Sequence, residues 1–324
     1  MAYRPRLSIS SVIAEAVSRI ERVRGFLDAA RLSDSWLEEM RSEALVREAH
    51  HSTHIEGTGL TLEQSQLLLA GGSPRVDPDA ARELRNYVDA FDLVAEYLDS
   101  GEPATEALVR EIHRRLVRGV RGDSGMPGRY RELQNQIVDT RTGEIVYVPP
   151  PHYDVPRLMS ELVEWLREER ELHRVLVAGV AQFRLVDIHP FVDGNGRTAR
   201  LLSMLCLYRS GYDLKRLCTL SEFYDRDLSA YYRALQCVRT SGGDLTEWAG
   251  FFVGGLADQL REVQARGERA IRRDALAHEH GLNERQRQIL GHVISRDEIA
   301  LRDLGTLVEA PRRTLQIPTR CDCP

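Results

Sequence analysis

The sequence predicts a mainly α-helical protein that contains one small β-hairpin. Apolar residues recur at spacings of three, four and seven over most of the 324 residues, which is the pattern of an amphipathic helix. One segment, Tyr130 to Val148, breaks this pattern. There Ile137 and Val138 precede a turn-rich stretch, Ile145 and Val146 follow it, and three prolines come next. A helical period with one interruption therefore indicates a helical bundle that carries a single hairpin.

The helices can be placed by their apolar faces and their start signals. The first one has Val17 and Ile20 on one face and Glu15 on the other. Asp154 before Pro156 is a start signal for a helix in the middle of the chain, because proline is tolerated in a first turn. Further helices are expected at about 84–98, 108–116, 158–166, 174–188, 197–209, 227–239, 246–266 and 283–294.

The hairpin is predicted from its turn and its end. Asp139 to Gly143 is rich in residues that favour turns. Pro149 to Pro151 cannot donate hydrogen bonds to a neighbouring strand, so the second strand must end before them. The sequence therefore predicts two short antiparallel strands around this turn.

Composition restricts the class of protein. Hydrophobic residues make up 42% and charged residues 29%, a balance that supports a packed core. The formal net charge of −5 gives no overall attraction to nucleic acid or to an anionic membrane. Five cysteines without a pattern argue against a disulfide framework, and the apolar runs are shorter than the ~20 residues of a membrane helix. We therefore expect a soluble, cytoplasmic protein.

One loop carries most of the chemistry that the sequence offers. It reads HPFVDGNGRTAR from His189 to Arg200 and joins two predicted helices. Gly194 to Gly196 can turn successive backbone N–H groups inward, and the next helix adds its positive N-terminal end. The loop is therefore a candidate site for an anion, and phosphate is the anion that such sites commonly hold.

The side chains of this loop fit phosphoryl or nucleotidyl transfer. Arg197 and Arg200 are three residues apart on one helix, so both guanidinium groups can reach phosphate oxygens. Asp193 can hold a Mg²⁺ ion that bridges phosphates, and His189 has a suitable side chain for a general base. Neither a P-loop nor a strand-linked GxGxxG motif is present to offer another nucleotide site.

The loop resembles the signature of the Fic family, HPFx[D/E]GNGRxxR, at every fixed position. The resemblance extends over roughly Leu84 to Leu260 and includes the hairpin and the YVPPP run after it. It implies a Fic-type helical bundle whose members mostly transfer AMP from ATP to a hydroxyl side chain of a target protein. The hairpin is similar to the family's flap, which aligns the target segment by strand-like pairing.

The resemblance implies a role for each residue of the motif. His189 would deprotonate the target hydroxyl, and Asp193 would hold Mg²⁺. Arg197 and Arg200 would bind the outer phosphates and stabilise the leaving pyrophosphate. The remaining residues implied in ATP or target binding are Gly194, Asn195 and Gly196 in the loop, Ile137 and Val138 in the flap, and Tyr231 and Tyr232 near the adenine, where ordinary helix packing explains the two tyrosines equally well.

A second motif resembles the family's inhibitory pattern, [S/T]xxxE[G/N]. It consists of Ser52, Glu56 and Gly57, and the first two lie four residues apart on one helical face. In the family this glutamate would pair with Arg200 and deny it to the γ-phosphate. A carboxylate in a triphosphate site also repels the phosphates. The resemblance therefore implies an enzyme that is inhibited from within its own chain.

The chain is expected to divide into four regions. Residues 1–79 form a helical region with the inhibitory motif and residues 80–266 the Fic core. Residues 267–282 form a charged linker, with a solvated helix as the alternative reading. Residues 283–324 resemble the start of a winged helix-turn-helix in which Arg312 and Arg313 would begin the recognition helix. A small helical packing element is the alternative reading of this last region.

Three readings of function remain open from the sequence. The first is an autoinhibited protein adenylyltransferase that uses ATP and Mg²⁺, with a target protein and the chain itself as acceptors. The second keeps the fold and changes the chemistry, to removal of AMP, which Glu56 would serve by positioning water, or to transfer of another phosphate-containing group. The third is a DNA-binding regulator that uses the core to sense nucleotides. Members of the family often form homodimers through helical faces, so a homodimer is a further expectation.

Overall fold

The computed structural model describes residues 3–100, 102–138 and 143–296. Its helices are α1 (Ser11–Ala29), α2 (Asp34–Ile55), α3 (Leu62–Leu69), α4 (Pro78–Ser100), α5 (Glu106–Val117), α6 (Val155–Glu168), α7 (Arg174–Ile188), α8 (Asn195–Arg209), α9 (Leu220–Arg226), α10 (Leu228–Thr240), α11 (Thr246–Glu279) and α12 (Glu284–Arg296). The strands are β1 (Ile137–Val138) and β2 (Ile145–Tyr147), and three short 3-10 turns complete the described elements: Val120–Asp123, His152–Asp154 and Leu214–Arg216. The predicted mainly α-helical class is confirmed.

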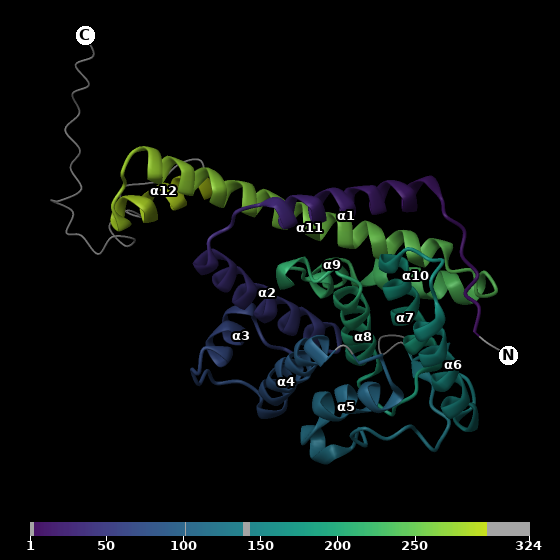
Figure 1. Cartoon of the computed structure of the whole chain (residues 1–324). Coiled ribbons are helices and arrows are strands. Elements are labelled where there is room, and N and C mark those ends of the chain that lie inside the picture. Colours follow the sequence, from purple (N-terminus) through teal and green to yellow (C-terminus); the bar gives the residue numbers. More distant parts are fainter. Residues whose placement is uncertain (1–2, 101, 139–142, 297–324) are drawn as a thin grey trace, which may run out of the picture.

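Two long helices run side by side along one edge of the molecule, and the others form a bundle beneath them (Figure 1). α1 packs along α11, and α11 also contacts α7, α9 and α10. At the centre, α7 and α8 form the most extensive helix pair, with α4 and α5 on the outer side of α8. α12 folds back on the far end of α11, beyond the bundle (Figure 1). The loop between α7 and α8 therefore starts from the best-packed part of the fold.

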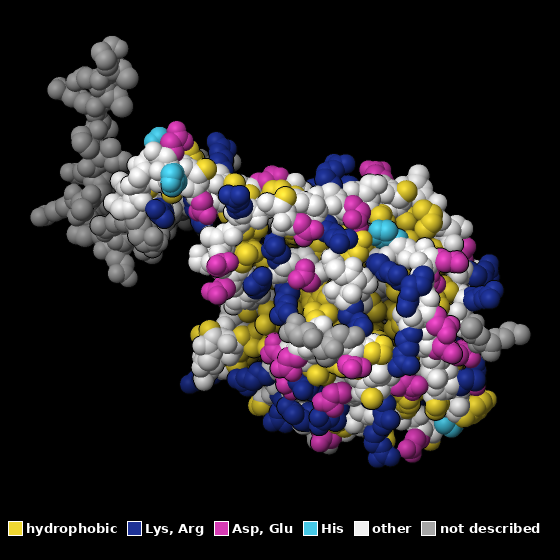
Figure 2. Space-filling model, viewed as in Figure 1, with side chains coloured by type: hydrophobic (Ala, Val, Ile, Leu, Met, Phe, Trp, Pro, Cys, Tyr) yellow, Lys and Arg dark blue, Asp and Glu magenta, His cyan; other side chains and the backbone are white. Residues whose placement is uncertain are grey.

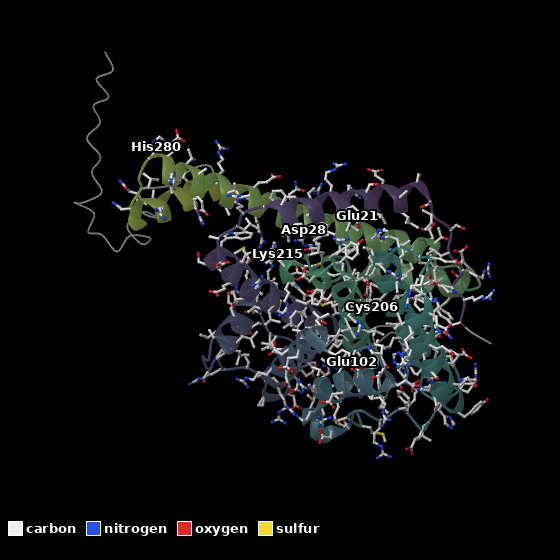
Figure 3. The ribbon with its side chains drawn as sticks, in the orientation of Figure 1. Glu21, Asp28, Glu102, Cys206, Lys215 and His280 are labelled. Atoms are coloured by element: carbon white, nitrogen blue, oxygen red, sulfur yellow. The ribbon has the colours of Figure 1, made fainter. Side chains whose placement is uncertain are left out.

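The core surrounds α7, α8 and the first half of α11. Trp248 is fully buried and donates its indole N–H to the carbonyl of Gly179 at 2.7 Å. Tyr224 and Phe252 pack around its ring. Cys206 lies within α8, in the interior of the molecule (Figure 3). This apolar packing fixes the position of α7 relative to α8.

The surface mixes charges of both signs. Figure 2 shows Lys and Arg side chains interspersed with Asp and Glu over the visible face, without a large region of one sign. This agrees with a formal net charge of only −5. Within the described residues, no helix is long and apolar enough to cross a membrane.

The hairpin forms where the sequence predicts it. β1 and β2 are antiparallel, with Ile137 opposite Tyr147 and Val138 opposite Ile145, and the pairing is irregular between these two positions. Most of the predicted turn, residues 139–142, lies outside the described residues.

Several helices have different bounds from those expected. α11 continues to Glu279, so residues 267–279 are helical, in line with the alternative reading of this segment as a helix and not with the linker. Charged helix formers can extend a helix when one side is covered, and here Gly267 and Ala270 are buried. α3 and α9 were not predicted, because seven or eight residues give too few turns for a clear period. The division of the chain into four regions stays a prediction, and Arg312 and Arg313 lie outside the described residues.

Trp248 gives a test of this core. We expect Trp248→Phe to lower the melting temperature by several degrees, because it leaves a void and removes the hydrogen bond to Gly179. Trp165→Phe is the matched control, since the Trp165 indole donates to the half-buried Glu169 near the surface. Thermal unfolding followed by circular dichroism measures both. Equal losses in the two variants would contradict the central role of Trp248.

Candidate active site

The loop of the predicted site joins α7 to α8 with a sharp reversal. His189 ends α7 in the left-handed region, with φ 51° and ψ 58°, and its N–H still bonds to Leu185 at 2.9 Å. Gly194 precedes α8 at φ 75°, a conformation that glycine adopts without strain. The two helices therefore deliver His189 and the free N–H groups of α8 to the same place.

The loop is held from inside by a buried amide. Asn195 accepts a hydrogen bond from the N–H of Phe191 and donates one to its carbonyl, both at 2.9 Å. The Asn195 side chain is buried, so it fixes the loop instead of projecting into a ligand site. Its predicted contact with ATP is thus limited to the backbone in this conformation.

A buried histidine supports the loop from the side of α5. The His113 ring stacks on Phe191 with centroids 3.7 Å apart. Its Nε2 lies 2.9 Å from the carbonyl of Asp193, and its Nδ1 accepts the N–H of Gly128. Because Nδ1 accepts, Nε2 carries the hydrogen and donates it to Asp193. Sequence reasoning missed His113; its only signal was a polar residue on the apolar face of a helix.

His189 is placed to act as a neutral base. Its ring is largely shielded from water, and burial lowers its pKa to about 4, below the usual value of about 6.5. The imidazole is therefore unprotonated at neutral pH. Its Nδ1 is buried, so Nε2 is the ring nitrogen that remains for a substrate.

Arg200 is occupied by the end of α2. Its Nε and Nη2 donate to the hydroxyl and the carbonyl of Ser52, both at 2.8 Å, and Nη2 also lies 2.8 Å from Oε1 of Glu56. Arg200 is 2% exposed. Burial alone would lower its pKa, but the neighbouring carboxylate of Glu56 more than offsets this, so the pKa is raised. The structure thus joins the two motifs that are 144 residues apart in sequence.

Gly196 makes room for this contact. A Cβ atom added to Gly196 would lie 2.2 Å from Oε1 of Glu56. The carboxylate therefore rests directly on the loop at the start of α8, where a phosphate would bind. Gly57, directly after Glu56, has φ 98° and turns the chain away from the end of α2. Each residue of the predicted inhibitory motif thus has a defined place in the contact.

Arg197 is bound by a carboxylate that the sequence did not point to. Its Nη1 lies 2.6 Å from Glu83 on α4, and the two side chains are 1% and 2% exposed. Arg121 also reaches Glu83 at 3.0 Å and lies 3.5 Å from Asp193. Burial raises the pKa of Glu83, and the two arginines oppose that rise. Arg197 and Arg200, predicted to act together, are therefore each held by a different acidic residue.

The hairpin is anchored beside His189. The Tyr147 hydroxyl lies 2.6 Å from a carboxylate oxygen of Asp187, two residues before His189. Arg239 stacks over the Tyr147 ring at 3.4 Å. Ile137 is half-buried and Val138 is exposed, and among the described strands β1 pairs only with β2, so its other edge has no strand beside it. The structure thus brings the predicted flap to the predicted base.

The two predicted tyrosines differ in position. Tyr231 is buried and stacks on Tyr224 with centroids 4.5 Å apart, whereas Tyr232 is half exposed. Their rings lie 5.4 Å apart. Tyr231 therefore belongs to the core next to α9, and Tyr232 is the one with a face free for a ligand.

The end of α2 is also fixed by histidines. His51 and His54 each place Nδ1 2.8 Å from the carboxylate of Asp225 on α9. Their bonds lower the pKa of Asp225 against the opposing effect of burial. The described residues hold no group of three or more His, Cys, Asp or Glu side chains arranged for a metal ion. The histidines therefore serve to dock the inhibitory motif on α9.

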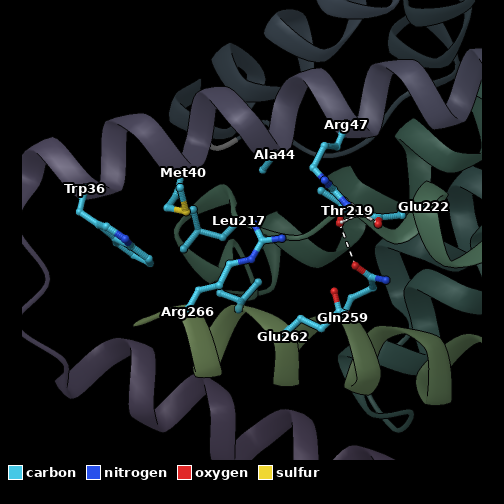
Figure 4. A pocket seen from close by; sticks show the side chains of 11 residues that line it. Trp36, Met40, Ala44, Arg47, Leu217, Thr219, Glu222, Gln259, Glu262 and Arg266 are labelled. Atoms are coloured by element: carbon cyan, nitrogen blue, oxygen red, sulfur yellow. Dashed lines mark hydrogen bonds and ion pairs between the residues drawn. The ribbon is translucent and has the colours of Figure 1, made fainter. Parts of the chain in front are cut away.

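A separate pocket lies between α2 and α11, away from the loop (Figure 4). Thr219 donates to Gln259 at 2.8 Å within it, and Arg47 pairs with Glu222. The pairing with Arg47 and with Arg226 lowers the pKa of Glu222 to about 2, against the effect of burial. Trp36 and Met40 close the other end. This pocket is lined by a satisfied ion pair and core side chains, so it carries no reactive group.

Comparisons with known proteins agree with the geometry. Residues 103–207 match the Fic/DOC family. The protein adenylyltransferase Fic of Drosophila mojavensis is 33% identical over 202 residues, which are 60% of this chain and 38% of that protein. The protein of the same name from Drosophila melanogaster is 32% identical over 63% of this chain and 40% of its own length. The chain thus spans about two fifths of the length of these relatives.

Solved structures share the whole fold. A Fic family protein from Desulfovibrio desulfuricans G20 superposes with a TM-score of 0.70 at 26% identity, over 96% of this chain and 88% of that one. A fragment of Fic-1 from C. elegans superposes with a TM-score of 0.63 at 25% identity, over 81% of this chain and 73% of that one. The similarity therefore includes the helices that surround the loop as well as the loop itself.

The Arg197–Glu83 pair predicts a large effect of a small change. Glu83→Gln removes the nearer carboxylate of the buried Arg197 and leaves only Asp193 at 3.6 Å, which we expect to lower the free energy of unfolding by about 3 kcal/mol. Glu262→Gln is the control, because Glu262 pairs with Arg226 at the surface, and a much smaller loss is expected. Denaturant unfolding measures both variants. An equal loss of unfolding free energy in both variants would show that burial does not make the Arg197–Glu83 pair more important than the surface pair.

Buried histidines predict the response to acid. Burial lowers the pKa of His50, His113 and His189 to about 4 each. Between about pH 6.5 and 4 the unfolded chain therefore binds protons that the folded chain does not, so stability falls as the pH falls. The melting temperature measured across this range should decrease, and less steeply in His113→Gln. A melting temperature independent of pH in this range would contradict the burial of these rings.

Proposed function

We propose that this chain, whose residues 103–207 match the Fic/DOC family, is an autoinhibited protein adenylyltransferase that transfers AMP from ATP to a hydroxyl side chain of a target protein. The observation that carries the proposal is the contact of Glu56 with both Arg200 and the loop at Gly196. A carboxylate held at this position occupies a site that attracts anions, as expected if the loop binds a ligand with several negative charges.

Each step of the transfer has a residue in place. Nε2 of His189 takes the proton of the target hydroxyl, whose oxygen then attacks the α-phosphorus of ATP. The bond from that phosphorus to the oxygen that leads to the β-phosphate breaks, and pyrophosphate leaves. The N–H groups at the start of α8 and the guanidinium of Arg200 stabilise the charge on the leaving group. The buried neutral imidazole of His189 supports its role as the base.

Asp193 fits a magnesium ion. Its side chain is 39% exposed at the mouth of the loop, and carboxylate oxygen is the donor that this ion prefers. A bound Mg²⁺ would neutralise part of the negative charge on the phosphates of ATP. Arg121, which lies 3.5 Å from Oδ2 of Asp193, would have to move aside to leave that oxygen available, while Oδ1 accepts the N–H of Gly194 at 2.6 Å.

In the resting state Glu56 blocks the γ-phosphate. Arg200 donates three hydrogen bonds to Ser52 and Glu56, so these N–H groups are not available to bind ATP. Activation then requires the end of α2 to release Arg200. Tyr232, with its half-exposed ring, is proposed to contact the adenine, and the outer edge of the hairpin to align the target segment.

The partners and location are part of the same proposal. ATP and a target protein are the substrates, and the chain itself serves as an acceptor. The cytoplasm suits the three described cysteines, which are free thiols. Dimerisation through helical faces and DNA binding by residues 283–324 stay predictions.

Removal of AMP is the second candidate, and the position of Glu56 favours it. The carboxylate lies against the loop at Gly196, where it can orient a water molecule for attack on the phosphorus of a bound AMP ester. The bond from that phosphorus to the side-chain oxygen then breaks, and AMP and the free hydroxyl side chain are released. The two reactions differ in their need for Glu56. Loss of Glu56 would activate the addition of AMP, whereas it would abolish the removal of AMP.

The test is a covalent adduct of AMP. We expect Glu56→Gly to raise auto-modification with ATP and Mg²⁺ by about tenfold or more, because a charged hydrogen bond to Arg200 is lost from the resting state. Intact-protein mass spectrometry measures the adduct. His189→Ala in the same background should abolish it while ATP binding persists.

Two results would overturn the assignments. Glu39→Gly is the matched control on α2, far from Arg200, and an equal rise in this variant would assign the effect to loosening of the helix. No adduct in Glu56→Gly, with loss of AMP removal from a modified protein, would favour the second candidate.

A further inference from the structure

An open pocket of about 470 Å³ lies at the foot of the hairpin. Its lining includes three arginines: Arg110 from α5, and Arg129 and Arg131 from the segment that leads into β1. His152, just after the second strand, lines it as well. Nothing in the proposed transfer of AMP uses this pocket.

Arg131 connects the pocket to the catalytic loop. Its Nε donates to the carbonyl of His189 and its backbone N–H to the carbonyl of Pro190, both at 2.9 Å. Its Nη1 donates to the carbonyl of Leu133 at 3.2 Å, at the entrance to the hairpin. A ligand in the pocket would therefore lie one side chain away from the backbone of the proposed base.

The pocket holds more positive charge than its own carboxylates balance. Glu132 pairs with Arg129 at 3.2 Å. The other carboxylate nearby, Glu106 on α5, accepts the hydroxyl of Tyr130. Among the described residues, Arg110 and Arg131 have no carboxylate within ion-pair distance. Two guanidinium groups thus face a site that offers them only backbone carbonyls.

Those carbonyls do not neutralise the arginines. Arg110 donates to the carbonyl of Gly128 at 2.7 Å and lies over the ring of Tyr130 at 5.5 Å. Arg131 is 3% exposed, and its burial lowers its pKa. A buried cation without a counter-ion is costly, so a carboxylate that enters the pocket would gain from both charges.

Exposed apolar side chains next to the lining residues in sequence favour a protein ligand over a free anion. Leu133, next to Glu132, is 78% exposed, and Tyr153, whose neighbour His152 lines the pocket, is 73% exposed. Val148, at the end of the hairpin, is also exposed. Inorganic phosphate cannot cover these apolar side chains, whereas a peptide segment can.

We propose that this pocket binds a carboxylate side chain of the target protein, a few residues from the hydroxyl that receives AMP. The inference rests on the proposed transfer and adds to it a preference for acidic target segments. A segment paired with the outer edge of the hairpin runs toward its foot, and a Glu or Asp on it reaches Arg110 there, near Arg131 and beside the Arg129–Glu132 pair. The pocket thus selects the target, while the loop performs the chemistry.

The first experiment measures binding without catalysis. Two fluorescent peptides with one central threonine are compared by anisotropy with the full chain, one rich in glutamate and the other with glutamine in its place. We expect about tenfold tighter binding of the glutamate peptide, decreasing as salt is raised. The variant Arg110→Ala/Arg129→Ala should remove this difference. Arg131 is left intact, because it also supports the hairpin and the loop.

A matched control separates local from general charge. Arg22→Ala/Arg261→Ala removes two arginines from α1 and α11, helices that do not line the pocket, and should leave the difference between the peptides unchanged. Equal binding of the two peptides, or equal loss in both double variants, would overturn the proposal. Competition by inorganic phosphate without any difference between the peptides would also overturn it, and would assign the pocket to a free anion.

The second experiment joins the pocket to the reaction. In the Glu56→Gly background, kcat/KM for AMP transfer to the glutamate peptide should exceed that for the glutamine peptide by about tenfold, mainly through KM. Arg110→Ala/Arg129→Ala should bring the ratio close to one. A ratio that this change leaves intact would overturn the proposal. If the acidic peptide binds preferentially but AMP is transferred to no acceptor, the proposed function is contradicted. The assignment of the pocket as a carboxylate-binding site would then still hold.

Discussion

The contact between Arg200 and the end of α2 is the interaction on which the rest of the site depends. Three hydrogen bonds of 2.8 Å tie this buried guanidinium to Ser52 and Glu56. They fix α2 against α8, and they also fill the place where a phosphate chain would lie. In the function that we propose, an anion of the substrate would replace Glu56 as the charged partner of this buried arginine. The side chains that join α2 to α8 are therefore the same ones to which we assign control of the site.

The contact between Arg200 and Glu56 is surrounded by side chains that hold the loop in place. The loop is locked from within by Asn195 and from the side by His113, which stacks on Phe191. Arg197 is held by Glu83 on α4, and the hairpin is held by Tyr147 on Asp187. Each of these supports comes from a different helix or strand, so the position of His189 is set by the whole bundle. A base that must reach a substrate hydroxyl benefits from such fixed geometry.

Sequence reasoning succeeded where a signal was local. The helix predicted at 174–188 matches α7, and the hairpin follows from its turn and its prolines. It failed for the short helices α3 and α9 and for the continuation of α11, because burial of Gly267 and Ala270 depends on neighbours that a period does not contain. Among site residues, Glu83, His113 and Arg131 were missed for the same reason. Each is an ordinary polar residue within its own segment and gains its role from a partner more than 50 residues away.

By itself the sequence determined the class of fold, the loop from His189 to Arg200 and the motif around Glu56, because each is a short run whose residue types and spacings carry the chemistry. Only the tertiary structure decided that Glu83 holds Arg197, whereas the pairing of Glu56 with Arg200 was already implied by the motif around Glu56. It also decided that three arginines converge at the foot of the hairpin. Ion pairs of this kind form between elements that are distant in the chain, and their geometry depends on how helices pack, which no local pattern encodes.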